Sequence, residues 1–215
     1  MRKLTVGFLL LMVLAFIAFE ASSFSKTENK NVVIHKSSAE ETLKMPSPEL
    51  VKLQTKALLA KQFVKKKNFD ACFCFLIDMS LPSNHKRFFI YDLKKDTILN
   101  SGLVTHGNCN QYWLTGRKYG NDVGCGCTSL GKYKIGNAYY GRFGLAFKLY
   151  GLEITNSNAF ARAVVLHSHS CVPENEVDSD ICQSNGCPTV SPDFLKKLEP
   201  MIKGSKKAVL LWIFE

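Results

Sequence analysis

The chain has 215 residues, which is enough for one ordinary domain with a leader and a short extension. Hydrophobic residues make up 46% of it and only seven prolines occur, so its composition excludes a disordered protein. A net charge of +10 could attract nucleic acid, anionic lipid or an acidic polymer. The basic residues are scattered, however, and form no stripe interleaved with aromatic residues. We interpret them as a solvated surface and predict no nucleic-acid partner.

The N-terminus has the pattern of a secretory signal peptide. Arg2 and Lys3 precede an apolar run over residues 6–19, and small residues follow at 21–23. The run is too short to span a bilayer comfortably and suits the hydrophobic region of a signal peptide. We predict a cleaved signal over residues 1–23 and an exported protein of the periplasm or cell envelope. The alternative is an uncleaved segment that keeps the protein on the membrane.

The rest of the chain divides by composition and periodicity. Residues 24–47 are rich in Ser, Lys and Glu and predict a polar linker. Apolar residues then recur on one face over 48–68, and lysines end this run where positive charge suits the helix dipole, so an N-terminal helix is expected. Short β-rich runs separated by turn residues fill 69–215. One helix returns late, with Ser191 as its cap and Pro192 in its first turn.

Eight cysteines in an exported chain indicate disulfides. A catalytic thiol would leave seven, so a fully bridged framework and a thiol enzyme are competing interpretations of the count. Cys171 and Cys182 would close a short loop, and we predict that they bridge, which contributes about 3 kcal/mol by chain entropy. The two Cys-x-Cys pairs lack the Cys-x-x-Cys spacing usual in zinc sites, so we predict no metal site.

The strongest local signal for chemistry is Ser-Asn-Gly-Cys-Pro at residues 184–188, with Leu-His-Ser-His upstream at 166–169. A thiol needs a nearby base to become a nucleophile at neutral pH, and histidine is the usual one. A glycine before the nucleophile permits a tight turn that exposes the sulfur and aims backbone N–H groups at a developing oxyanion. From spacing alone, Cys187 is either a catalytic thiol or a disulfide cysteine.

These residues resemble the signature of the YkuD-type L,D-transpeptidases, in which a histidine lies upstream of Ser-x-Gly-Cys. The chain is more similar still to the second branch of that family, the murein L,D-transpeptidase catalytic domains. Further segments match that branch in the same order, at residues 77–83 with Arg87, 104–107, 129–131 and 140–153. The similarity extends over residues 49–215. It implies a mostly β domain, the family's β-sandwich, with a short helix after the cysteine loop.

The resemblance also implies a role for each residue of the motif. Cys187 is the expected nucleophile and His167 its base, and an ion pair with the imidazole is expected to lower the pKa of the thiol. Ser168 is expected to orient the imidazole through its backbone or its hydroxyl. The N–H groups of Gly186 and Cys187 are the expected oxyanion donors. His169 is an alternative base, but the apolar run leads directly into His167.

Three further residues are expected at the substrate. Ser184 is the motif serine, which we expect to shape the loop and line the substrate site. Asn185 stands where the wider family has His and this branch often has Trp, so its side-chain role is open. His106 lies in a glycine-flanked loop and either lines the substrate cleft or is a structural histidine.

The activity implied by the resemblance is acyl transfer on peptidoglycan stem peptides. The thiolate attacks the carbonyl after the third residue of a tetrapeptide stem, the terminal D-residue leaves, and an amine of a neighbouring stem resolves the thioester into a cross-link. Water would resolve it in an L,D-carboxypeptidase. No metal or organic cofactor is implied. The remaining alternative is a non-catalytic, disulfide-stabilised wall module in which Cys187 is bridged.

Overall fold

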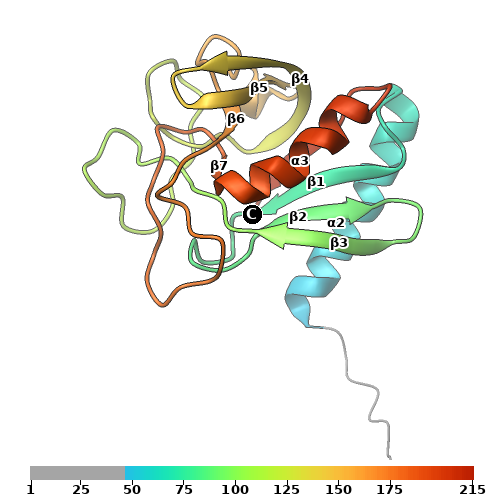
Figure 1. Cartoon of the computed structure of the whole chain (residues 1–215), viewed down its shortest axis with the longest axis horizontal. Coiled ribbons are helices and arrows are strands. Elements are labelled where there is room, and N and C mark those ends of the chain that lie inside the picture. Colours follow the sequence, from blue (N-terminus) through green and yellow to red (C-terminus); the bar gives the residue numbers. More distant parts are fainter. Residues whose placement is uncertain (1–46) are drawn as a thin grey trace, which may run out of the picture. The chain divides into compact units, whose positions relative to one another are not determined.

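The computed structural model describes residues 47–215, shown in colour in Figure 1. The predicted signal segment, and the predicted linker except for its last residue, lie outside these residues. Within the described part of the chain, no helix is long and apolar enough to cross a membrane.

One sheet of eight strands, two α-helices and a short 3-10 helix make up the described residues. The helices are α2 (Pro48–Lys67), η1 (Ile154–Asn156) and α3 (Pro192–Gly204). The strands are β1 (Phe73–Asp78), β2 (Phe88–Asp92), β3 (Thr97–Gly102), β4 (Gly131–Gly141), β5 (Gly144–Gly151), β6 (Val165–Ser168), β7 (Thr189–Val190) and β8 (Leu210–Phe214). Their order is β3-β2-β1-β8-β4-β5-β6-β7. The predicted mostly β fold, with an N-terminal helix and a short helix after the cysteine loop, is confirmed.

The C-terminal strand joins the two halves of the sheet. β8 pairs in parallel with β1 on one side and antiparallel with β4 on the other. β6 and β7 also run in parallel, with His167 opposite Thr189 and Ser168 opposite Val190. This pairing matters most for the site, because it brings the histidine segment beside the cysteine segment.

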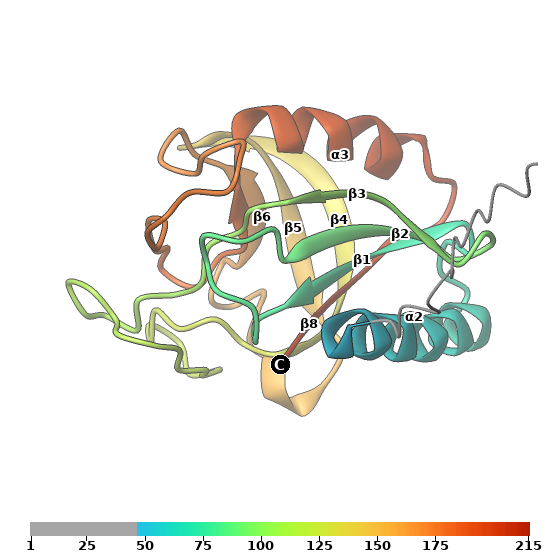
Figure 2. The same ribbon diagram turned by 90° about the horizontal axis from the view of Figure 1, so that it is seen from below.

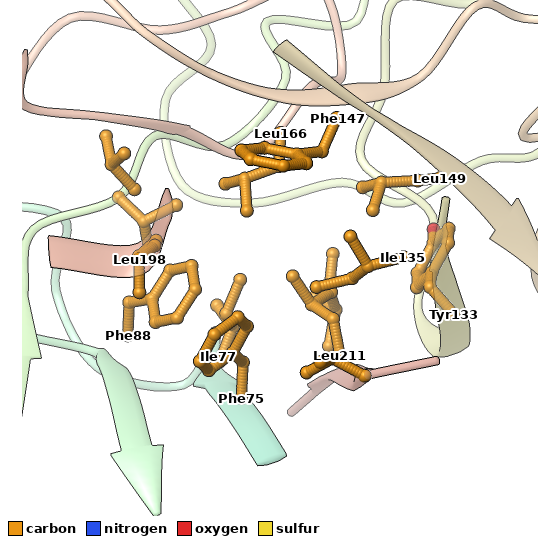
Figure 3. Close-up of a cluster of buried hydrophobic side chains, with 14 of the residues drawn as sticks. Phe75, Ile77, Phe88, Tyr133, Ile135, Phe147, Leu149, Leu166, Leu198 and Leu211 are labelled. Carbon is orange, nitrogen blue, oxygen red and sulfur yellow. The ribbon is translucent and has the colours of Figure 1, made fainter. Parts of the chain in front are cut away.

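The expected β-sandwich is built from this single sheet. One hydrophobic cluster takes side chains from both halves, so the sheet curves over its own core. Figure 3 shows Phe75 and Phe88 of one half facing Phe147 and Leu166 of the other, with Leu198 of α3 beside them. Figure 2 shows α3 and α2 on opposite sides of the strands. With both faces covered, β8 is buried along its whole length instead of alternating.

The N-terminal helix covers the outer face of the sheet. The hydroxyl of Ser47 accepts a hydrogen bond from the N–H of Leu50 at 3.3 Å, and Asn68 ends the helix in the left-handed conformation. The apolar residues of its inner face pack on a second hydrophobic cluster; they are Leu53, Ala57, Ala60 and Val64. The helix therefore docks on the domain, as its sequence pattern indicates.

Leu53→Ala should lower the free energy of unfolding by about 2–5 kcal/mol, because Leu53 is only 3% exposed under α2 and its removal leaves a cavity. Leu58, on the same helix, is 57% exposed and provides the control. Leu58→Ala should change stability by no more than about 0.5 kcal/mol. Urea unfolding of the two variants measures the difference, and equal effects would contradict the docking of α2.

Candidate active site

The cysteine and the histidine of the motif line one pocket of about 220 Å³. β6 carries His167, and Cys187 lies just before β7, so the parallel pairing of these two strands places both residues in the lining of this pocket. The sulfur itself lies against the backbone of Val165 and Ala163 at the start of β6. Of the residues expected at the site, the pocket brings together His167, Ser184, Asn185 and Cys187. It also contains residues that the motif did not single out: Thr105, Phe143, Gln183 and Thr189.

Cys187 has no disulfide partner, as expected, and it follows a glycine turn. The preceding Gly186 has φ of 102°, a conformation that favours glycine. A Cβ there would lie 2.5 Å from the carbonyl oxygen of Cys127, so no other residue fits without a shift. The predicted need for glycine before the nucleophile therefore has two physical causes, backbone conformation and close packing.

The hydroxyl of Ser184 closes this turn. It donates to the carbonyl of Cys187 at 2.7 Å and accepts from the N–H of Gly186 at 3.2 Å. These two hydrogen bonds from Ser184 tie the carbonyl of Cys187 to the N–H of Gly186 across the turn. Because the N–H of Gly186 is directed to this hydroxyl, the N–H of Cys187 is the better candidate of the two expected oxyanion donors.

The thiol of Cys187 is partly buried. Burial raises its pKa, while a hydrogen bond from the N–H of Val165, at 3.5 Å from the sulfur, and the positive charge of Arg162 act in the opposite direction. The expected lowering of the thiol pKa by an ion pair with His167 is therefore wrong for this state of the site. Desolvation outweighs the groups that favour the thiolate.

The ring of His167 is oriented by two hydrogen bonds. Its Nδ1 lies 3.1 Å from the carbonyl oxygen of Ser168, and because a carbonyl can only accept, Nδ1 carries the proton. Ser168 thus acts through its backbone. The basic atom is Nε2, which lies 3.0 Å from the hydroxyl of Thr189. Burial lowers the pKa of His167 despite the opposing bond to Ser168, so the imidazole rests neutral, as a general base requires.

Phe143, at the tip of the β4–β5 hairpin, lies against both histidines of the motif. Its ring stacks on that of His167 at 4.7 Å between centroids, and its edge meets His169 at 5.9 Å. His169 is exposed, and its Nδ1 accepts a hydrogen bond from the N–H of Cys171 at 3.1 Å. His167, by contrast, is buried, and as the motif histidine it remains the expected base. No local sequence pattern singles out Phe143.

His106 lies outside the pocket lining, so the structure does not bring it to the other candidate substrate residues. It is buried, and its Nδ1 accepts from the guanidinium of Arg87 at 3.1 Å. Burial and the charge of Arg87 lower the pKa of His106 to about 4, so the ring is neutral. Its backbone carbonyl accepts from the N–H of Ser184 at 2.9 Å. This geometry favours the structural alternative for His106. Asn185, in contrast, is exposed and lines the pocket.

Two disulfides lie close to the site. Cys171 and Cys182 bridge, which confirms the predicted clip on the loop between base and nucleophile. A second bridge, Cys109–Cys127, was not predicted. Spacing could not reveal it, because it joins two loops that only the fold brings together. In residues 47–215, no cluster of three or more His, Cys, Asp or Glu side chains is arranged to hold a metal ion.

The family model for the L,D-transpeptidase catalytic domain, YkuD_2, matches residues 42–213. The chain therefore belongs to the family of L,D-transpeptidase catalytic domains, as its motifs predicted. A search of curated proteins finds no significant match.

Solved structures that resemble this chain share little sequence with it. They include the LD transpeptidase LdtMt1 in complex with imipenem, with 12% identity, a TM-score of 0.38, and coverage of 66% of this chain and 59% of that chain. The helical cell shape determining protein Pgp2 of Campylobacter jejuni has 16% identity and a TM-score of 0.37, with 67% and 47% covered. A fused Zn-dependent amidase/peptidase/peptidoglycan-binding protein of Clostridium acetobutylicum has 13% and 0.36, with 79% and 63% covered. The present chain spans less than two thirds of each.

His167→Ala should slow acylation of Cys187 by a carbapenem by roughly 10²–10⁴-fold, the range typical of general-base catalysis. His169→Ala is the matched control and should cost much less, since His169 is exposed and is not the motif histidine. Acylation rates of both variants, followed across pH by intact mass, provide the measurement. A large loss in His169→Ala beside a near-normal His167→Ala would reverse the assignment.

Proposed function

We propose that this protein is an exported cell-wall L,D-transpeptidase that acts on peptidoglycan tetrapeptide stems through a thioester on Cys187. The observation that carries the proposal is one pocket with a free thiol and a neutral, oriented imidazole. Membership of the L,D-transpeptidase family supports the reaction class. The stem peptides are the proposed partners, and the periplasm or cell envelope is the proposed location.

The first half of the reaction forms the acyl-enzyme. Nε2 of His167 takes the proton of the Cys187 thiol as the sulfur attacks the carbonyl after the third residue of the stem. A C–S bond forms, and the negative charge moves to the carbonyl oxygen, where the N–H of Cys187 donates to it. When the intermediate collapses, the C–N bond to the terminal D-residue breaks and its amine leaves with the proton held by His167.

The second half resolves the thioester. An amine from a neighbouring stem loses a proton to His167, attacks the thioester carbonyl, and expels the sulfur, which recovers the proton. The product is a cross-link between two stems. Water in place of the amine would give an L,D-carboxypeptidase, which trims the same stems and is the alternative enzyme function. Competition between amine and water at this one step decides between them.

The electrostatics of the site suit this sequence of steps. Burial raises the pKa of the thiol and lowers that of the imidazole, so both groups rest neutral near pH 7. A neutral histidine can accept a proton, and its lowered pKa keeps it available into the mildly acidic range. The non-catalytic alternative required a bridged Cys187, and the free thiol argues against it.

The direct test is exposure of the folded protein to a carbapenem, because the proposed nucleophile would be acylated by the drug and held as a thioester. Intact mass should rise by one drug molecule per chain, and peptide mapping should place it on Cys187. Cys187→Ala should abolish the adduct, whereas Cys72→Ala, which removes an exposed free thiol, should retain it. An adduct that persists in Cys187→Ala would overturn the proposal. Incubation with tetrapeptide stems then separates cross-linked dimers from trimmed tripeptides.

Chelation should leave the rate of acylation unchanged, because every group in the proposed steps comes from the chain itself. The measurement is the carbapenem acylation rate before and after dialysis against EDTA. A loss of rate that zinc restores would contradict the prediction.

A further inference from the structure

A positive charge lies behind the Cys187 turn without an acidic partner. Arg162 belongs to the segment that leads into β6, and it does not line the pocket. Its guanidinium donates to the carbonyl of Gly120 at 2.9 Å, to the hydroxyl of Ser129 at 3.0 Å and to the carbonyl of Cys127. All three acceptors are neutral, and no ion pair of Arg162 occurs in the described part of the chain.

The guanidinium also sits beside the residue that precedes the nucleophile. A Cβ on Gly186 would lie 3.0 Å from Nη2 of Arg162 and 2.5 Å from the Cys127 carbonyl that Arg162 binds. Three residues further along the same segment, the N–H of Val165 donates to the sulfur of Cys187. One short stretch of chain therefore supplies a fixed charge behind the turn and a backbone dipole on the sulfur.

We propose that Arg162 is a positioning residue for Cys187, which holds the Cys127 carbonyl against Gly186 and stabilises the thiolate electrostatically as it forms. The catalytic meaning of this role rests on the proposed function. A half-buried cation without an acidic partner is screened less than one in solvent, so its field favours negative charge on the sulfur.

Arg162 is a source of fixed positive charge near the sulfur, because a guanidinium stays protonated at working pH. The other titratable groups near it are His167 and His169 across the pocket and Tyr133 on β4. His167 rests neutral because burial lowers its pKa, and a tyrosine supplies no positive charge. Burial raises the pKa of Cys187, and Arg162 is the charged group that opposes this rise.

The test compares Arg162→Gln with Arg162→Lys by alkylation of Cys187 with iodoacetamide across pH, since the thiolate is the reacting form. Peptide mapping follows Cys187 separately and uses the exposed Cys72 as an internal reference. Arg162→Gln should slow Cys187 about tenfold at pH 7 and move its profile to higher pH, the scale expected when a nearby opposite charge is lost. Arg162→Lys, which keeps the charge, should restore most of the rate.

Arg117→Gln is the control, because Arg117 also donates to backbone carbonyls, those of Ser80 and Leu81, but is exposed and pairs with Glu215. It removes the same charge elsewhere and should leave the Cys187 profile unchanged. An unshifted profile in Arg162→Gln would overturn the electrostatic role, even if activity were lost. If that variant does not fold, Arg162→Lys decides, because a profile displaced despite the retained charge would equally reject the role.

Alkylation needs no stem peptide, so the role of Arg162 can be rejected independently of the proposed function. A wild-type protein that neither takes up carbapenem nor processes stems, but whose profile shifts in Arg162→Gln, would reject the proposed function and retain the role of Arg162. Normal acylation with an unshifted profile would reject only Arg162.

Discussion

Hydrogen bonds between two segments that are distant in the sequence hold the whole site together. Thr105 donates its N–H to the carbonyl of Thr189 at 2.9 Å and its hydroxyl to the carbonyl of Cys187 at 3.2 Å. Further along, Ser184 donates its N–H to the carbonyl of His106 at 2.9 Å. These bonds fix both ends of the Cys187 turn against the segment of Thr105 and His106. The turn can then keep the positive-φ backbone at Gly186 that presents the sulfur.

A buried arginine anchors this junction to the core. Nε and Nη2 of Arg87 donate to the carbonyl of Val104 at 3.0 and 2.8 Å, and Nη2 also donates to His106. Arg87 is fully buried, and desolvation together with the charge of Arg117 lowers its pKa to about 10. A buried arginine is tolerated here because its N–H donors meet acceptors. Loss of the Arg87 side chain would leave the Val104 carbonyl and the Nδ1 of His106 without these hydrogen bonds. His106 thus supports the Cys187 turn without lining the pocket.

The site combines two opposing electrostatic tendencies. Burial holds the Cys187 thiol protonated, while the charge of Arg162 and the dipole at Val165 favour the thiolate. A thiol that stays protonated at rest is less open to oxidation than a standing thiolate. Burial also keeps His167 neutral, so in the proposed reaction the proton moves from sulfur to imidazole only during the attack.

The sequence by itself determined the features that depend on neighbouring residues. Helix caps such as Ser191, the glycine before Cys187 and the short Cys171–Cys182 bridge follow from local conformation and loop closure, and the motif pointed to Cys187 and His167 as the proposed thiol and base. Only the tertiary structure decided which residues meet the motif from a distance. Thr189 contacts the imidazole because β6 and β7 pair in parallel across a long loop, and Phe143 reaches it from a hairpin tip. Long-range pairing of this kind leaves no periodic trace in the chain, because each partner is an ordinary strand or turn residue until the sheet closes.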